Sequence, residues 1–112
     1  MMKKVAIIGC GWLGKALANS LIAQGHHVRG SVTSKDGLAL LQNMGIEPFL
    51  IKLNNEAIIG NLNLFVEGVD TIVIAFPPGL RKNPDANYAN RIKILVAALA
   101  KYPSCKLLLL SS

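Results

Sequence analysis

The sequence predicts an α/β fold built as a doubly wound parallel sheet of strand order 3-2-1-4-5, with helices on both faces. Short continuous apolar runs alternate along the chain with stretches of helical periodicity, which is the pattern of parallel strands buried on both faces. A glycine-rich loop directly follows the first apolar run. The length of 112 residues suits a single domain. Right-handed crossovers between successive strands then lead to the stated strand order.

The first predicted unit is a strand, a helix and a second strand. Residues 4–8 form a short apolar run bounded by lysine and glycine, as expected of a buried strand. From Leu13 to Gln24 the apolar residues follow helical spacing, and Gly25 after them is typical of a helix C-terminus. Residues 27–32 are predicted to form the second strand.

The second predicted helix begins at Ser34 or Lys35 and runs to Met44. Ser34 is a suitable N-cap, and Asp36 in the first turn complements the helix dipole. A third strand is expected over residues 46–53.

The second half of the chain continues the alternation. Residues 54–68 have a weaker pattern and are expected to hold a short helix. The apolar run 71–75 predicts a buried strand, which the segment 76–79 stops with two prolines and a glycine. Helical spacing predicts a helix over 85–101, and residues 105–110 predict a final apolar strand.

Composition and charge argue against several classes of protein. Charged residues make up 16% of the chain and hydrophobic residues 52%, so disorder is not expected. The apolar runs are too short to span a membrane, and residues 1–14 lack the apolar core of an export signal. The net charge is +6, with a basic excess between Arg81 and Lys106. We interpret that excess as a solvated helix face and expect no nucleic-acid partner, because no aromatic residues are interleaved with it.

The cysteines and histidines predict neither a disulfide nor a metal site. Cys10 and Cys105 are isolated, without the spacing of a metal or redox motif, and are typical of reduced thiols in a cytoplasmic protein. His26 and His27 have no ligand partner at useful spacing and are expected at a surface turn.

The loop after the first strand has G-x-G-x-x-G spacing and reads Gly9-Cys10-Gly11-Trp12-Leu13-Gly14. The pattern is informative here because it follows a predicted strand, opens a helix and lies within a first β-α-β unit. Gly9 permits the tight turn, Gly11 lets backbone N–H groups approach a pyrophosphate, and Gly14 lets the helix pack close to the sheet. We therefore predict a Rossmann-type, NAD(P)-binding domain in which Gly9 to Gly14 hold the diphosphate.

The end of the second strand bears on the choice of cofactor. NAD-binding folds usually carry an acid there, which binds the ribose 2′-hydroxyl, but that position falls near Val32. Thr33, Ser34 and Lys35 follow, two hydroxyls and a cation that suit a 2′-phosphate. We therefore predict NADP in preference to NAD, with Arg29 as a further source of positive charge.

A second part of the predicted site lies at the end of the fourth strand. Ligands in such sheets bind beyond the carboxyl ends of the strands, so Ala75, Phe76 and Pro77 are expected to line the ribose and nicotinamide. A simple strand stop would equally explain the prolines.

The segment from Lys3 to Gly14 resembles the start of the atypical extended short-chain dehydrogenase/reductases, nucleoside-diphosphate-sugar epimerase-like proteins that include the YeeZ-like group. The same group is matched by Gly30-Ser31, Thr33, Asp36-Gly37, residues 71–75 and the leucine-rich strand into Ser111-Ser112. The resemblance covers the whole chain but only the cofactor-binding half of such enzymes. It implies hydride transfer between a nicotinamide and a carbinol carbon, with Ser112 as the catalytic serine that contacts substrate.

The sequence departs from that family in two ways. Ile8 stands where the family's G-x-x-G-x-x-G signature has its first glycine. The Tyr-x-x-x-Lys pair that transfers protons in the family has no counterpart, because Tyr88 and Tyr102 lie in or just after the helix before the last strand. We therefore expect this chain to be catalytically incomplete by itself.

Two other functions stay open. The N-terminal cofactor domain of a hydroxyacid or prephenate-type dehydrogenase also has a fourth strand ending in Ala-x-Pro-Pro, and its catalytic residues come from a separate helical domain. A non-catalytic nucleotide-sensing domain, such as a potassium-transport regulatory domain, has a similar length. Those domains carry the second-strand acid that is absent at Val32.

The last predicted strand is unusually apolar for an edge. Leu107 to Leu110 would point to both faces of the sheet, and an exposed apolar edge favours aggregation. We therefore expect residues 1–112 to be a single domain truncated relative to a full-length enzyme, or to form a homodimer or swapped dimer through the fifth strand.

Overall fold

The computed structural model describes residues 3–9, 12–53, 57–75, 86–102 and 105–109. The elements within these ranges are, in chain order, β1 (Lys4–Ile8), α1 (Trp12–Ala23), β2 (His27–Val32), α2 (Lys35–Asn43), β3 (Glu47–Leu50), β4 (Lys52–Leu53), β5 (Ile58–Ile59), α3 (Leu62–Val66), β6 (Thr71–Ile74), α4 (Ala86–Leu99) and β7 (Lys106–Leu109). Each strand and helix expected from the sequence is present, with bounds shifted by a few residues. The short strands β4 and β5 were not expected.

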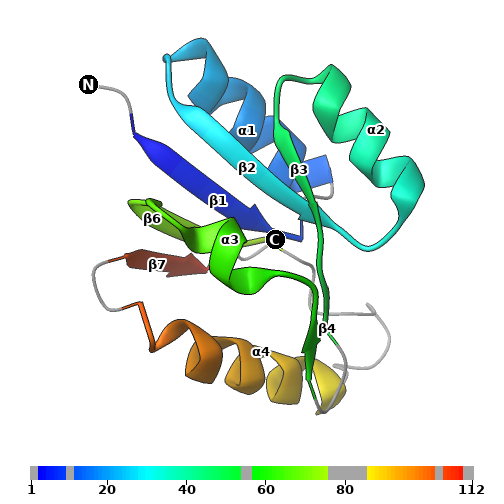
Figure 1. Ribbon diagram of the computed structural model, residues 1–112, viewed down its shortest axis with the longest axis vertical. Coiled ribbons are helices and arrows are strands. Elements are labelled where there is room, and N and C mark those ends of the chain that lie inside the picture. Colours follow the sequence, from blue (N-terminus) through cyan, green and yellow to red (C-terminus); the bar gives the residue numbers. More distant parts are fainter. Residues whose placement is uncertain (1–2, 10–11, 54–56, 76–85, 103–104, 110–112) are drawn as a thin grey trace.

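The central sheet has five parallel strands in the order β3-β2-β1-β6-β7 (Figure 1). The predicted doubly wound order is confirmed, because β6 and β7 are the fourth and fifth strands of that series. Ile7 of β1 pairs with Gly30 of β2, and Ile8 of β1 pairs with Ile74 of β6. The carboxyl ends of these three strands therefore lie at one edge of the sheet.

Helices cover both faces of the sheet, with α1 and α2 on one side and α3 and α4 on the other (Figure 1). Val5 and Ile7 of β1 belong to the core beneath α1 and α2, whereas Ala6 and Ile8 belong to the core beneath α3 and α4. Alternate side chains of a strand point to opposite faces, so a strand covered on both sides is apolar throughout. No helix in the described ranges is long and apolar enough to cross a membrane.

The third predicted strand is broken in the structure. β3 ends at Leu50, and β4 then pairs antiparallel with β5 in a separate two-stranded sheet. Gly60, directly after β5, has φ +130°, and a Cβ at this position would lie 2.5 Å from the carbonyl oxygen of Leu50. Glycine therefore allows the chain to return closely past β3 before α3 begins.

The β7 strand forms an apolar edge of the described sheet. Leu107 is 42% exposed and Leu108 is 53% exposed. Their partners in β6, Ile72 and Val73, face opposite cores, so the two leucines lie on opposite faces of the sheet. The sequence expectation of an exposed apolar fifth strand is confirmed for these two residues.

Candidate functional site

Three of the predicted site residues lie at the same edge of the sheet. Gly9, Thr33 and Ala75 are the residues directly after β1, β2 and β6. The backbone N–H of Ala75 donates to the carbonyl oxygen of Ile8 at 2.8 Å, so β1 and β6 stay paired up to the point where the glycine loop begins. This is the edge at which ligands of doubly wound sheets bind.

Gly9 makes the turn out of β1 that the motif predicts. Its φ is +79°, in the left-handed region that favours glycine. The Gly9 N–H donates to the Ser31 hydroxyl oxygen on the neighbouring strand β2 at 2.8 Å. Cys10 and Gly11, the next two predicted residues, lie outside the described residues.

The helix α1 begins at Trp12, three residues after Gly9. Gly14 in its first turn is buried, consistent with its predicted role in close helix packing. The first turn carries no acidic residue, so the positive end of the helix dipole is not neutralised from within the helix. This arrangement suits an anion such as a diphosphate. Trp12 and Leu13 belong to the helix backbone, and their side chains lie outside the described set.

The loop after β2 presents polar groups to solvent. Thr33, Ser34 and Lys35 are all exposed. The Ser34 hydroxyl accepts a hydrogen bond from the Gly37 N–H at 3.2 Å, which makes Ser34 the N-cap of α2, as predicted. β2 ends at Val32, so the position expected of an NAD-type acid is occupied by a valine.

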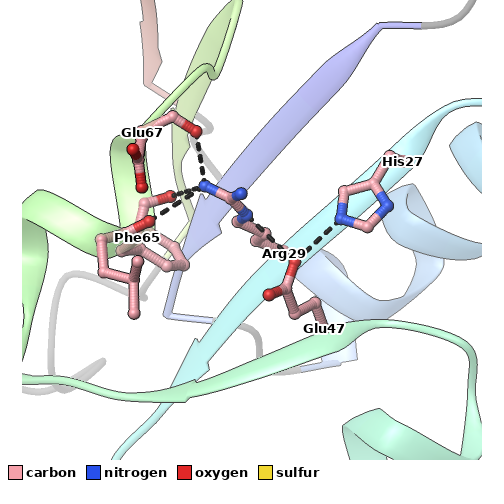
Figure 2. A network of polar contacts seen from close by, with 6 residues as sticks. His27, Arg29, Glu47, Phe65 and Glu67 are labelled. Carbon is pink, nitrogen blue, oxygen red and sulfur yellow. Dashed lines mark hydrogen bonds and ion pairs between the residues drawn. The ribbon is translucent and has the colours of Figure 1, made fainter.

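Arg29 lies in a different environment from the one its sequence position suggested. Its Nη1 donates to the carbonyl oxygens of Leu64, Phe65 and Glu67, at 3.0, 3.1 and 2.7 Å. Figure 2 shows the guanidinium reaching from β2 to the end of α3. The suggestion that Arg29 adds charge for a 2′-phosphate is therefore wrong, because these Nη1 bonds are made to the C-terminus of a helix.

Glu47 on β3 joins the same polar network. One of its carboxylate oxygens, Oε1, lies 2.9 Å from His27 Nε2 and accepts from Arg29 Nε at 3.1 Å (Figure 2). The hydrogen bond with His27, reinforced by Arg29, holds the pKa of Glu47 below its ordinary value despite partial burial. His27 is therefore the first residue of β2, with Glu47 as a hydrogen-bond partner, and does not lie in the surface turn expected from the sequence.

Among the described residues, the other positions singled out from the sequence supply no reactive side chain to the candidate site. Ala75 is buried at 6% exposure. Phe76, Pro77 and Ser112 lie outside the described residues. The Cys105 thiol donates to the Val69 carbonyl oxygen at 3.1 Å, and burial raises the pKa of this thiol, so it is a poor nucleophile near neutral pH. Within the same ranges, no group of three or more His, Cys, Asp or Glu side chains could hold a metal ion.

A cavity of about 350 Å³ lies away from the glycine loop. It is lined by residues of β5, α3 and α4, by Asn61 just before α3, and by Lys101 and Tyr102 just after α4. The Tyr102 hydroxyl donates to the Asn63 side-chain oxygen at the cavity wall. Among the predicted cofactor-binding residues that the structure describes, none lines this cavity.

Comparison with known proteins agrees with the nucleotide-binding geometry. Residues 4–101 match the family model described as "NADP oxidoreductase coenzyme F420-dependent". The chain is 39% identical to Protein YeeZ of Escherichia coli K12 over 101 residues, which are 88% of this chain. The resemblance to the YeeZ-like group is thereby confirmed. The chain spans only 37% of the length of that relative.

Solved structures share the fold at low sequence identity. A Bacillus halodurans protein described as an NAD-dependent epimerase/dehydratase superposes with a TM-score of 0.73 and 18% identity, over 98% of this chain and 51% of that one. The TrkA-N domain of the inner membrane protein ybaL of Escherichia coli gives a TM-score of 0.69 and 18% identity, over 99% and 74% of the two chains. Both likenesses show the Rossmann-like fold.

Proposed function

Because the chain belongs to the family described as "NADP oxidoreductase coenzyme F420-dependent", we propose that it binds NADP in preference to NAD at the sheet edge formed by Gly9, Thr33 and Ala75. The observation that carries the proposal is the left-handed turn at Gly9, followed within three residues by a helix whose first turn has no acid. A diphosphate at that helix start would meet unpaired N–H groups and the positive end of the dipole.

The preference for NADP rests on the loop after β2. Val32 cannot accept a hydrogen bond from a ribose 2′-hydroxyl, whereas the exposed ammonium of Lys35 and hydroxyl of Thr33 could contact a 2′-phosphate. The Ser34 hydroxyl already caps α2, so Lys35 and Thr33 are the groups we assign to the phosphate.

The proposed role in a larger activity follows from the relatives. We infer that the chain is the cofactor-binding part of an oxidoreductase or epimerase-like enzyme, with Ser112 at the substrate-contacting position by resemblance. The domain in this proposal spans residues 1–112, and the proton-transferring Tyr-x-x-x-Lys pair would come from a further segment. An open reading frame after Ser112 that encodes this pair would support the inference. One that encodes an unrelated helical domain would favour the hydroxyacid dehydrogenase alternative, and an immediate stop codon would favour a nucleotide-sensing domain.

The free thiol of Cys105 supports a cytoplasmic location for the protein. Oxidising compartments favour paired cysteines, whereas Cys105 is unpaired.

Binding is tested by titrating NADPH and NADH against the fluorescence of Trp12, the single tryptophan. We expect micromolar binding of NADPH and weaker binding of NADH. Lys35→Ala should raise the Kd for NADPH about tenfold and leave the Kd for NADH nearly unchanged, because one charge-assisted hydrogen bond is lost.

The matched control is Lys93→Ala, which removes the same charge from an exposed position on α4. It should leave both affinities unchanged. Failure to bind either dinucleotide would refute the proposed function. Equal effects of the two lysine substitutions would refute the assignment of Lys35 to the 2′-phosphate.

A further inference from the structure

Ser31 is the one polar residue in the described part of the chain that is fully buried, at 1% exposure. A buried hydroxyl is costly unless it is hydrogen-bonded. Here its oxygen accepts the N–H of Gly9 at 2.8 Å, a bond between residues 22 positions apart in the sequence. The buried hydroxyl therefore acts on the first residue of the glycine loop.

The bond forms where the backbone ladder of the two strands stops. The last described pair between β1 and β2 is Ile7 with Gly30, and the next residues, Ile8 and Ser31, lie beyond it. At Gly9 the chain turns with a positive φ, and the Gly9 N–H faces β2, where it meets the side-chain hydroxyl of Ser31. The Ser31 side chain supplies the acceptor for this N–H and links Gly9, where the loop begins, to β2.

The direction of the loop matters for binding an anion. A diphosphate is held by several backbone N–H groups at once, and these groups must already point to a common centre if the ligand is not to order them on binding. Gly9 begins the loop that leads into α1, and Ser31 anchors this beginning to the neighbouring strand.

We propose that Ser31 is a positioning residue for dinucleotide binding, which holds the glycine loop in its binding conformation through the Gly9 N–H. The proposal rests on the proposed function. It assigns no contact between Ser31 and the cofactor itself, because the hydroxyl is buried within the fold.

The test compares Ser31→Thr with Ser31→Val. The two new side chains have nearly the same shape and both suit a strand, so they differ in the hydroxyl alone. Two quantities are measured for each: the Kd for NADPH, and the hydrogen exchange of the Gly9 amide without ligand. We expect Ser31→Thr to bind close to wild type and Ser31→Val to bind about tenfold more weakly, with faster Gly9 exchange.

A control separates loop positioning from general destabilisation. Val28→Ala removes buried apolar groups three residues before Ser31, on the opposite face of β2 from the hydroxyl. It should lower the stability of the domain while the Kd of the folded protein and the Gly9 exchange at low denaturant stay near wild type. Should Ser31→Val not fold, Ser31→Ala replaces it in the comparison with Ser31→Thr, since alanine adds no atoms to the core.

The possible results distinguish a failure of the role given to Ser31 from a failure of the proposed dinucleotide binding. If wild type binds NADPH and the Val and Thr variants bind equally well, Ser31 is structural only and the present inference is overturned. If wild type binds neither NADPH nor NADH, the proposed function fails, and this inference fails with it. Weaker binding by Ser31→Val with normal Gly9 exchange would also refute the mechanism, because the loop would then be unaffected.

Discussion

Arg29 shows how one partly buried cation can complete a short helix. α3 has only five residues, so most of its carbonyl oxygens have no partner within the helix. The Arg29 guanidinium satisfies three carbonyl oxygens at its C-terminal end and is 11% exposed. A positive charge at a helix C-terminus is also favoured by the helix dipole. The guanidinium lies 5.9 Å from the centre of the Phe49 ring, which makes the same side chain part of the packing beneath α3.

We expect Arg29→Ala to lower the free energy of unfolding by about 2–4 kcal/mol, because the carbonyl oxygens near the end of α3 lose a charged donor. Arg29→Lys should recover part of this loss, since an ammonium keeps the charge but cannot reproduce the geometry of the guanidinium. Urea unfolding measures both variants, and the m-value should stay constant. Lys52→Ala, at an exposed position of β4, is the control and should change stability by less than about 0.5 kcal/mol. A loss no larger for Arg29→Ala than for this control would contradict the role given to Arg29.

The residues of the candidate site differ in how far the sequence could predict them. The turn at Gly9 and the cap at Ser34 were predicted because both depend on neighbouring residues in the chain. The roles of Arg29 and Ser31 were missed because their partners are 35 to 38 and 22 residues away. A signal was present nevertheless. His27, Arg29 and Ser31 alternate with Val28, Gly30 and Val32, and this period of two indicates that one face of β2 meets polar groups.

The close packing of α2 on β2 depends on a glycine in the first turn of α2. Gly37 lies in the first turn of α2, and a Cβ there would lie 2.9 Å from the Cβ of Val32 and 3.0 Å from each of its methyl carbons. Val32 is the last residue of β2, directly before the loop proposed to bind the 2′-phosphate. The contact therefore sets how closely the start of α2 approaches the end of β2.

We expect Gly37→Ala to destabilise the protein by about 1–2 kcal/mol, because overpacking outweighs the gain of about 1 kcal/mol that alanine brings to a helix. In a Val32→Ala background the same substitution should cost less, since two of the three close contacts are removed. Thermal unfolding of the two single variants and the double variant gives the coupling energy. Additive effects of the two substitutions would show that the contact with Val32 does not limit the helix position.

The elements that the sequence predicted well are those with strong local patterns. The apolar runs of β1 and β6 and the helical spacing of α1, α2 and α4 need no distant partner to be recognised. β4 and β5 have two residues each, too few to show any periodicity. Their pairing depends on the return of the chain at Gly60 past Leu50, which is a tertiary contact that local sequence does not indicate.

The two edges of the sheet are unequally protected against pairing with a further strand. β3 carries Pro48, whose missing N–H weakens pairing with a further strand, and this is a usual protection of an edge. β7 has no proline from Lys106 to Leu109, its one charged residue is Lys106 at its start, and its central leucines are exposed on both faces. Beside it, a cavity of about 180 Å³ is lined by Val96 and Leu99 of α4 and by Leu107. Apolar surface is thus continuous from β7 to α4.

We propose that the 112-residue chain covers this surface with a second copy of itself, by pairing or exchanging its β7 strands. The chain should elute as a dimer in gel filtration, with a monomer fraction that grows on dilution. Leu107→Lys should shift the equilibrium to the monomer, because Leu107 lies on the surface shared with α4 and a charge would be buried there beside the paired strands. Leu40→Lys is the matched control, since Leu40 is 51% exposed on α2 and far from β7 in the chain.

Each copy carries a formal charge of +6, so added salt should strengthen association of the wild type by screening repulsion. A wild-type chain that stays monomeric at high concentration and high salt, or a Leu40→Lys chain as monomeric as Leu107→Lys, would contradict an interface at β7.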